Sequence, residues 1–172
     1  ADIKIEYSDK KNFRKHRFLS ESVRTMKELN YFSKITLSDL EPATKYYYRF
    51  SVNGVVNKES NMLGEFSTPS SSPFSYKITL ATCANTGSSH PVYDRIREEG
   101  SLFYLMLGDF HYGNIYKDCD DEFLAHYNAA LGSIKQSKLY KSTPVAYMWD
   151  DHDYGPNNSS GLSPNQDGDV AS

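Results

Sequence analysis

Three carboxylates and a histidine stand side by side near the end of the chain, at Asp150, Asp151, His152 and Asp153. They follow the apolar run 145–149, which favours a buried strand, and precede a Gly-Pro-Asn-Asn sequence that is typical of a turn. Because closely spaced carboxylates repel one another, this spacing favours a cation among them. Hard carboxylate oxygens suit hard metal ions, so the sequence indicates a metal site, and a solvated acidic loop is the alternative.

Two other apolar stretches end in side chains that can bind metals. Residues 102–107 lead into a Gly-Asp pair that ends at Asp109, and residues 77–82 lead into Cys83. The carboxyl ends of parallel strands meet at one edge of an α/β sheet, where ligands gather. The three stretches therefore predict a single shared site at the ends of three neighbouring strands.

Composition sets the broad class of the protein. The chain has 172 residues, of which 38% are hydrophobic and 24% charged, enough for one medium domain or two small ones. The formal net charge of −3 gives no basic footprint for nucleic acid, and no run approaches the roughly 18 apolar residues of a membrane helix. Cys83 and Cys119 are too few for a disulfide framework, although a bridge between them stays open.

Residues 1–69 are predicted to form an all-β unit. Residues 3–7 and 44–52 alternate between apolar and polar, and Asn53-Gly54 is a pair typical of hairpin turns. The basic stretch 8–17 is interpreted as a solvated loop rather than a nucleic-acid patch, because no aromatic stacking platform accompanies it. The Leu-x-Pro-x-Thr-x-Tyr pattern ending at Tyr46 resembles the corner of fibronectin type III sandwiches, where a tyrosine ties the turn to the backbone. The unit is short for a sandwich, so we expect its first strands to be missing.

Residues 70–76 are rich in serine and proline and are predicted to be a linker. Residues 77–172 then alternate between strand and helix patterns, with helices expected over 91–99 and 120–136. This alternation predicts an α/β fold with parallel strands, in a sheet covered by helices on both faces.

Three motifs together resemble a known family. A strand followed by Cys-Ala-Asn, then Gly-Asp-Phe-His-Tyr, then Trp-Asp-Asp-His-Asp-Tyr-Gly-Pro-Asn-Asn is similar to alkaline phosphatase D, the PhoD-like branch of the calcineurin-type metallophosphoesterases. The resemblance covers nearly the whole chain. It implies a metallophosphoesterase core behind a small fibronectin III-like unit, and a phosphodiesterase or phosphomonoesterase that uses a dinuclear metal site and a bridging hydroxide.

The resemblance also implies roles for individual residues. Cys83 and Tyr112 would ligate Fe³⁺, and Asp109 would bridge it to Ca²⁺ or another divalent cation. Asp151 stands where the wider superfamily has an asparagine ligand. No organic cofactor is implied, and the expected partner is a phosphoester substrate.

His152 matches the histidine that contacts the substrate phosphate, and Asp153 matches the acidic residue that orients it. His152 would then protonate the leaving oxygen or brace the phosphoryl group. Four further residues are expected to lie around the site or to touch the substrate, namely Asp150, His111, Asn157 and Asn158.

The chain departs from the family pattern after His152. The later Asn or Asp and the Gly-His-x-His histidines that complete such a site are absent, so we expect a fragment that lacks the C-terminal part and is inactive alone. The alternatives are a non-catalytic binding module with a vestigial phosphatase domain, or another binuclear hydrolase. The resemblance implies an exported protein, although the chain carries no export signal, and the substrate stays open.

Overall fold

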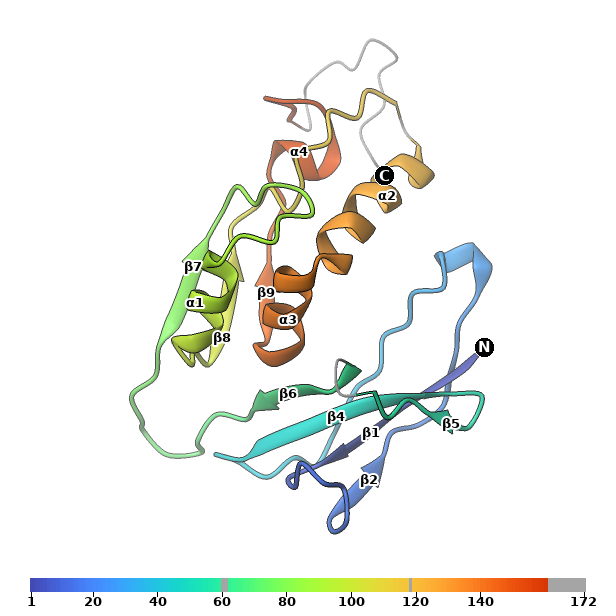
Figure 1. Ribbon diagram of the computed structural model, residues 1–172, viewed down its shortest axis with the longest axis vertical. Coiled ribbons are helices and arrows are strands. Elements are labelled where there is room, and N and C mark those ends of the chain that lie inside the picture. The colour runs from blue at the N-terminus through green and yellow to red at the C-terminus, as the bar shows by residue number, and fades with distance from the viewer. Residues whose placement is uncertain (60–61, 118, 161–172) are drawn as a thin grey trace. The chain divides into compact units, whose positions relative to one another are not determined.

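The computed structural model describes residues 1–59, 62–117 and 119–160, and the chain divides into two compact units, Ala1–Ser75 and Tyr76–Ser172 (Figure 1). The division falls within the residues predicted as a linker. The last twelve residues of the predicted catalytic region lie outside the described residues.

The first unit is built on one antiparallel sheet. Its centre is the long pair of β1 (Asp2–Ser8) and β4 (Lys45–Val52). The other edge of β1 pairs with two short strands, β2 (Arg17–Leu19) and β3 (Val23–Arg24). The edge of β4 that faces away from β1 likewise pairs with β5 (Val55–Val56) and β6 (Gly64–Ser67). A 3₁₀ turn at Lys27–Leu29 follows β3.

This sheet confirms the all-β prediction, and the basic stretch 8–17 is largely the loop between β1 and β2. In the described residues, this unit forms one branched antiparallel sheet of six strands.

The predicted tyrosine corner is present. Tyr46 is buried, and its hydroxyl accepts a hydrogen bond from the Glu41 backbone amide at 2.9 Å. At the far end of β4, Asn53 and Gly54 both have positive φ, 48° and 81°, as a tight hairpin turn needs. Short-range turn chemistry therefore fixes both ends of β4.

The second unit contains a three-stranded parallel sheet in the order β7 (Ile78–Ala81), β8 (Phe103–Met106) and β9 (Val145–Tyr147). Residues Ile78 to Ala81 pair with Phe103 to Met106, and Tyr104 to Met106 pair with Val145 to Tyr147. The predicted parallel strands are confirmed. All three strands point their carboxyl ends toward the same edge.

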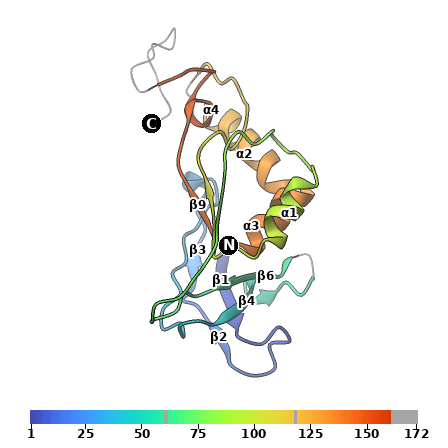
Figure 2. The same cartoon turned by 90° about the vertical axis from the view of Figure 1, so that its left-hand side faces the viewer.

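Within the described residues, the helices lie against one face of this sheet, so the expected cover on both faces is not found there (Figure 2). Tyr104 and Met106 of β8 are buried under α1 (Val92–Glu98), α2 (Asp120–Gly132) and α3 (Ile134–Ser142). On β7, Leu80 stays 57% exposed. The cause is topological, because right-handed crossovers that advance in one direction, β7 to β8 to β9, place every helix on the same side.

The helix expected over 120–136 is two helices. Ser133 adopts an extended conformation (φ −66°, ψ 142°), ends α2 and begins α3. Its hydroxyl accepts a hydrogen bond from the Gln136 amide and donates one to the Ser88 carbonyl. A cap residue directly after Gly132 therefore outweighs the apolar periodicity, and the apolar Ile134, which a single helix over 120–136 would include, is 66% exposed.

Candidate metal centre

Two of the predicted ligands lie at the ends of β7 and β8, where the chain segments run side by side. The Cys83 amide donates to the Gly108 carbonyl at 3.2 Å, and the Ala84 amide donates to the Asp109 carbonyl at 2.9 Å. Cys83 and Asp109 both have left-handed backbones, with φ of 61° and 54°. Residues other than glycine rarely adopt this backbone conformation, and those that do concentrate at functional sites. The turns bring the Cys83 Sγ to 3.6 Å from the Asp109 Oδ2.

The third strand delivers its residues through a short helix instead of the expected loop. Helix α4 (Asp151–Tyr154) begins directly after Asp150, whose side chain accepts a hydrogen bond from the Asp151 amide. Asp150 and Asp153 form a reciprocal capping box at this N-terminus. Asp150 is therefore committed to the cap, and Asp151 and His152 occupy the first turn.

Asp109, Asp151 and His152 meet at one point. One ligand-type atom from each of these residues lies within 4.8 Å of the others. Asp109 and His152 are buried, and Asp151 is half-buried. A carboxylate pair with an imidazole is a donor set that suits a divalent or trivalent cation.

Tyr112 and Cys83 border the same point. The Cys83 thiol and the Asp109 carboxylate raise the pKa of the Tyr112 hydroxyl, and the Tyr112 ring centre lies 4.5 Å from that of His152. The structure thus brings together Cys83, Asp109, Tyr112, Asp151 and His152. Both cysteines of the chain are free thiols, so no bridge diverts Cys83.

The two central carboxylates perturb each other. Burial raises the pKa of Asp109 and the facing Asp151 carboxylate raises it further, which outweighs the hydrogen bonds from Tyr112 and His152. Burial also raises the pKa of Asp151, but the backbone amides of Asn158 and His152 and the shared hydrogen bond with Asp109 bring it below its ordinary value. The pair therefore favours one shared proton or a bound cation.

Protein cations do not neutralise these groups. None of the ion pairs formed by the described residues includes Asp109, Asp151 or Asp153. Closely spaced carboxylates without a lysine or arginine partner fit a site for a metal cation.

His152 is oriented by a backbone carbonyl. Its Nδ1 lies 3.4 Å from the Gly113 carbonyl oxygen. A carbonyl can only accept, so this contact places the proton on Nδ1 and leaves Nε2 as the free acceptor of the neutral ring. Gly113 could not be predicted for this role, because a backbone oxygen carries no side-chain signature.

Asp153 has other partners than the histidine it was expected to orient. Its carboxylate accepts hydrogen bonds from the backbone amides of Asp109 at 2.7 Å, Phe110 at 2.8 Å and Asp150 at 3.0 Å. Both oxygens face main-chain donors because the β8 loop folds against the start of α4. The orienting role therefore passes to the Gly113 carbonyl.

The remaining expected residues surround this point. The Asn157 amide donates to the Asn114 side chain, and the Asn158 amide donates to the Asp151 carboxylate. His111 is fully buried beside His126, and burial lowers its pKa to about 4. Its Nδ1 accepts a hydrogen bond from the Gly113 amide at 3.1 Å. His111 therefore shapes the loop as a neutral ring.

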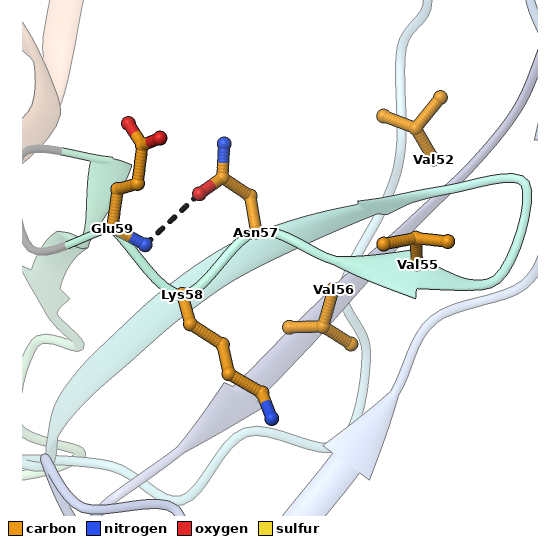
Figure 3. A pocket seen from close by; sticks show the side chains of 6 residues that line it. All are labelled: Val52, Val55, Val56, Asn57, Lys58 and Glu59. Atoms are coloured by element: carbon orange, nitrogen blue, oxygen red, sulfur yellow. Dashed lines mark hydrogen bonds between the residues drawn. The ribbon is translucent and has the colours of Figure 1, made fainter.

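A separate hollow lies on the first unit, beside the β4–β5 hairpin (Figure 3). Its volume is about 610 Å³, and its lining residues run from Val52 to Glu59 around the hairpin. Its polar side chains are Asn57, Lys58 and Glu59, which lack the clustered donors of the metal centre. Across the described part of the chain, no helix is both long enough and apolar enough to cross a bilayer.

Comparisons with known proteins agree with this picture. Residues 1–70 match the family described as PhoD-like phosphatase, N-terminal domain. Among solved structures, the chain is similar to one titled "Structure of PhoD", with a TM-score of 0.75 and 19% sequence identity. That match covers 95% of this chain and 34% of the other, so the chain spans about a third of its length. No curated protein matches the chain.

The structural match shows a shared fold, and the sequence match shows a shared N-terminal domain. The predicted resemblance is thereby confirmed: residues 1–70 match the PhoD-like phosphatase N-terminal domain, and 95% of the chain shares the fold of the PhoD structure.

Proposed function

We propose that this chain carries part of the active site of a metal-dependent phosphoester hydrolase of the PhoD-like type. The observation that carries the proposal is the meeting of Asp109, Asp151 and His152 within 4.8 Å, with the Cys83 thiol 3.6 Å from Asp109 and the Tyr112 ring against His152. Five donors of four chemical kinds, from three strand ends, are more than a packing role requires. The PhoD-like N-terminal domain supports the same reading.

The donors divide by chemistry. Cys83 and Tyr112 offer a thiolate and a phenolate, which suit Fe³⁺, and Asp151 offers an oxygen that suits Ca²⁺ or a similar divalent cation. Asp109 lies between the two groups and would bridge a dinuclear centre. Two such cations would neutralise the oxygens of a phosphoester and lower the pKa of a water molecule to near neutrality.

His152 would act on the substrate side. With its proton fixed on Nδ1 by the Gly113 carbonyl, a second proton on Nε2 makes it a donor to a phosphoryl or leaving oxygen. The Tyr112 ring packs beside the imidazole and limits its rotation. These contacts support the role that the resemblance assigned to His152.

The proposal also covers the fold of each unit and the location of the protein. We propose a calcineurin-type metallophosphoesterase core for the second unit, a fibronectin III-like fold for the first unit, and export of the whole protein. Activity on phosphomonoesters or phosphodiesters is proposed for the whole protein, since the chain spans about a third of the matched structure.

The direct test is elemental analysis of the purified chain for iron and calcium. We expect bound metal in the wild type and its loss in Asp109→Ala, because Asp109 touches both groups of donors. Asp121→Ala, which removes an exposed carboxylate of α2, is the matched control and should keep the metal. A folded wild-type chain that binds neither ion would contradict the proposal and favour the binding-module alternative.

A further inference from the structure

We infer that Asp153 is a positioning residue that holds Asp109 in place for metal binding. Its carboxylate would act as a clamp between the β8 loop and the first turn of α4. The inference rests on the proposed metal site, since Asp109 and Asp151 are the ligands that the clamp aligns.

The clamp joins two distant segments of the chain. One oxygen, Oδ2, accepts the backbone amides of Asp109 at 2.7 Å and Asp150 at 3.0 Å, and these amides come from the two segments. The other oxygen, Oδ1, accepts the Phe110 amide at 2.8 Å. The Oδ2 atom therefore holds the ligand Asp109 close to Asp150, the residue that directly precedes the second ligand, Asp151.

Burial makes these bonds strong and their loss costly. Asp153 is 1% exposed, and none of the ion pairs among the described residues includes it. Three backbone amides stabilise its carboxylate. Charge-assisted bonds of this kind are about twice as strong as neutral ones and hold their donors in a fixed geometry.

The clamp explains the left-handed conformation of Asp109. A φ of 54° is unfavourable for aspartate by about 1 kcal/mol or more, and it persists only where neighbouring contacts fix the backbone. Two successive amides, those of Asp109 and Phe110, point at one carboxylate in this conformation. The Asp109 side chain is thereby directed toward Asp151 and His152 before any cation arrives, which lowers the ordering cost of binding.

An amide at position 153 can replace only part of this pattern. In Asp153→Asn, the remaining oxygen can serve the two amides on Oδ2, but its NH₂ group would face the Phe110 N–H. Asp153→Ala removes every acceptor. Mn²⁺ affinity and amide protection should decrease in the order Asp, Asn, Ala at position 153. Asp121→Asn on exposed α2 is a charge-matched control.

The experiment uses the full 172-residue chain, with Mn²⁺ as the probe in calorimetric titration and amide hydrogen exchange as a local readout. We expect Asp153→Asn to fold, to bind Mn²⁺ at least about tenfold more weakly, and to exchange the Asp109 and Phe110 amides at least about tenfold faster. Exchange at Met106 in β8 and binding by Asp121→Asn should stay as in the wild type. Unchanged affinity and unchanged exchange at 109 and 110 in Asp153→Asn would overturn the inference.

Two outcomes separate the clamp from the metal site itself. If the wild type binds no Mn²⁺, the proposed function fails, while the exchange rates still decide about the clamp. If neither variant folds, wild-type exchange decides, since the Asp109 and Phe110 amides lie outside any helix or strand. Protection of those two amides supports the clamp, and exchange at the rate of an open loop refutes it.

Discussion

At the scale of single residues, the site depends on unusual backbone conformations at the ends of two strands. Gly108, Asp109 and Cys83 all have positive φ, at 99°, 54° and 61°. Gly108 combines that conformation with a close approach, because a Cβ there would lie 2.4 Å from the Asp150 Cβ and 2.9 Å from its nitrogen. Glycine at this position therefore allows the β8 turn to touch the start of α4.

Gly108→Ala should destabilise the second unit by about 2–4 kcal/mol, from backbone strain together with the clash against Asp150. Urea unfolding followed by circular dichroism measures this loss. Gly100→Ala is the control, because Gly100 also has positive φ, 64°, but has no atom near the added Cβ. It should cost only about 1 kcal/mol. Equal losses in the two variants would show that the contact with Asp150 is unimportant.

At the scale of elements, tyrosines pack the face of the parallel sheet that lies under the helices. Tyr104 of β8 is 2% exposed and stacks on Tyr140 of α3, and Phe110 stacks between Tyr127 and Tyr140. Burial raises the pKa of Tyr104 and of Tyr127 to about 12. Between about pH 10 and pH 12, these phenols therefore keep their protons in the folded unit but lose them in the unfolded chain.

The second unit should therefore lose stability in alkali. A folded pKa above the ordinary value of 10 gives stability that is complete below pH 10 and declines toward pH 12. Tyr104→Phe removes one such group and should make this decline shallower by at most about 1.4 kcal/mol per pH unit. Unfolding free energies from pH 8 to 11 measure the slope, with the exposed Tyr116→Phe as the control. A slope unchanged by Tyr104→Phe would contradict the assignment.

In the first unit, the Tyr46 hydroxyl is the contact that joins the turn before β4 to the strand. Tyr46→Phe leaves the Glu41 amide without its 2.9 Å partner and should cost about 1 kcal/mol of unfolding free energy. Tyr31→Phe, at a residue 63% exposed, should change the stability by less than about 0.5 kcal/mol. Thermal unfolding of both variants compares the two positions, and similar midpoints would argue against the corner.

At the scale of the whole molecule, the chain is two compact units joined by a serine- and proline-containing connection. Ala1–Ser75 carries twelve lysines and arginines against nine aspartates and glutamates, and Tyr76–Ser172 carries seven against thirteen. The positive balance of the first unit and the negative balance of the second fit the placement of the proposed metal site in the second. Bound cations would offset part of this negative charge.

Limited proteolysis should cut the chain between these units. Phe74 and Tyr76 are 42% and 57% exposed and lie outside any helix or strand, so brief chymotrypsin treatment should yield two main pieces. Mass spectrometry identifies the cut sites, and Phe74→Ser combined with Tyr76→Ser should slow the cleavage. Early cutting inside β4 or β8 instead would contradict the division into two stable units.

The sequence by itself determined the long strands β1 and β4, the three parallel strands of the second unit, the tyrosine corner and the candidate ligands Cys83, Asp109, Tyr112, Asp151 and His152. These features depend on residue type and on neighbours a few positions away, such as apolar alternation, an Asn-Gly turn or acidic residues after a strand. Resemblance in three short motifs supplied the family and the proposed roles.

Only the tertiary structure decided which groups complete the site and which face of the sheet is covered. The handedness of the crossovers placed α1, α2 and α3 on one side, and capping at Ser133 divided a helix that periodicity had made continuous. Asp153 reaches amides 43 and 44 positions away, and His152 reaches the Gly113 carbonyl 39 positions away. Such partners are backbone atoms brought close by packing, and no residue type in the sequence marks them.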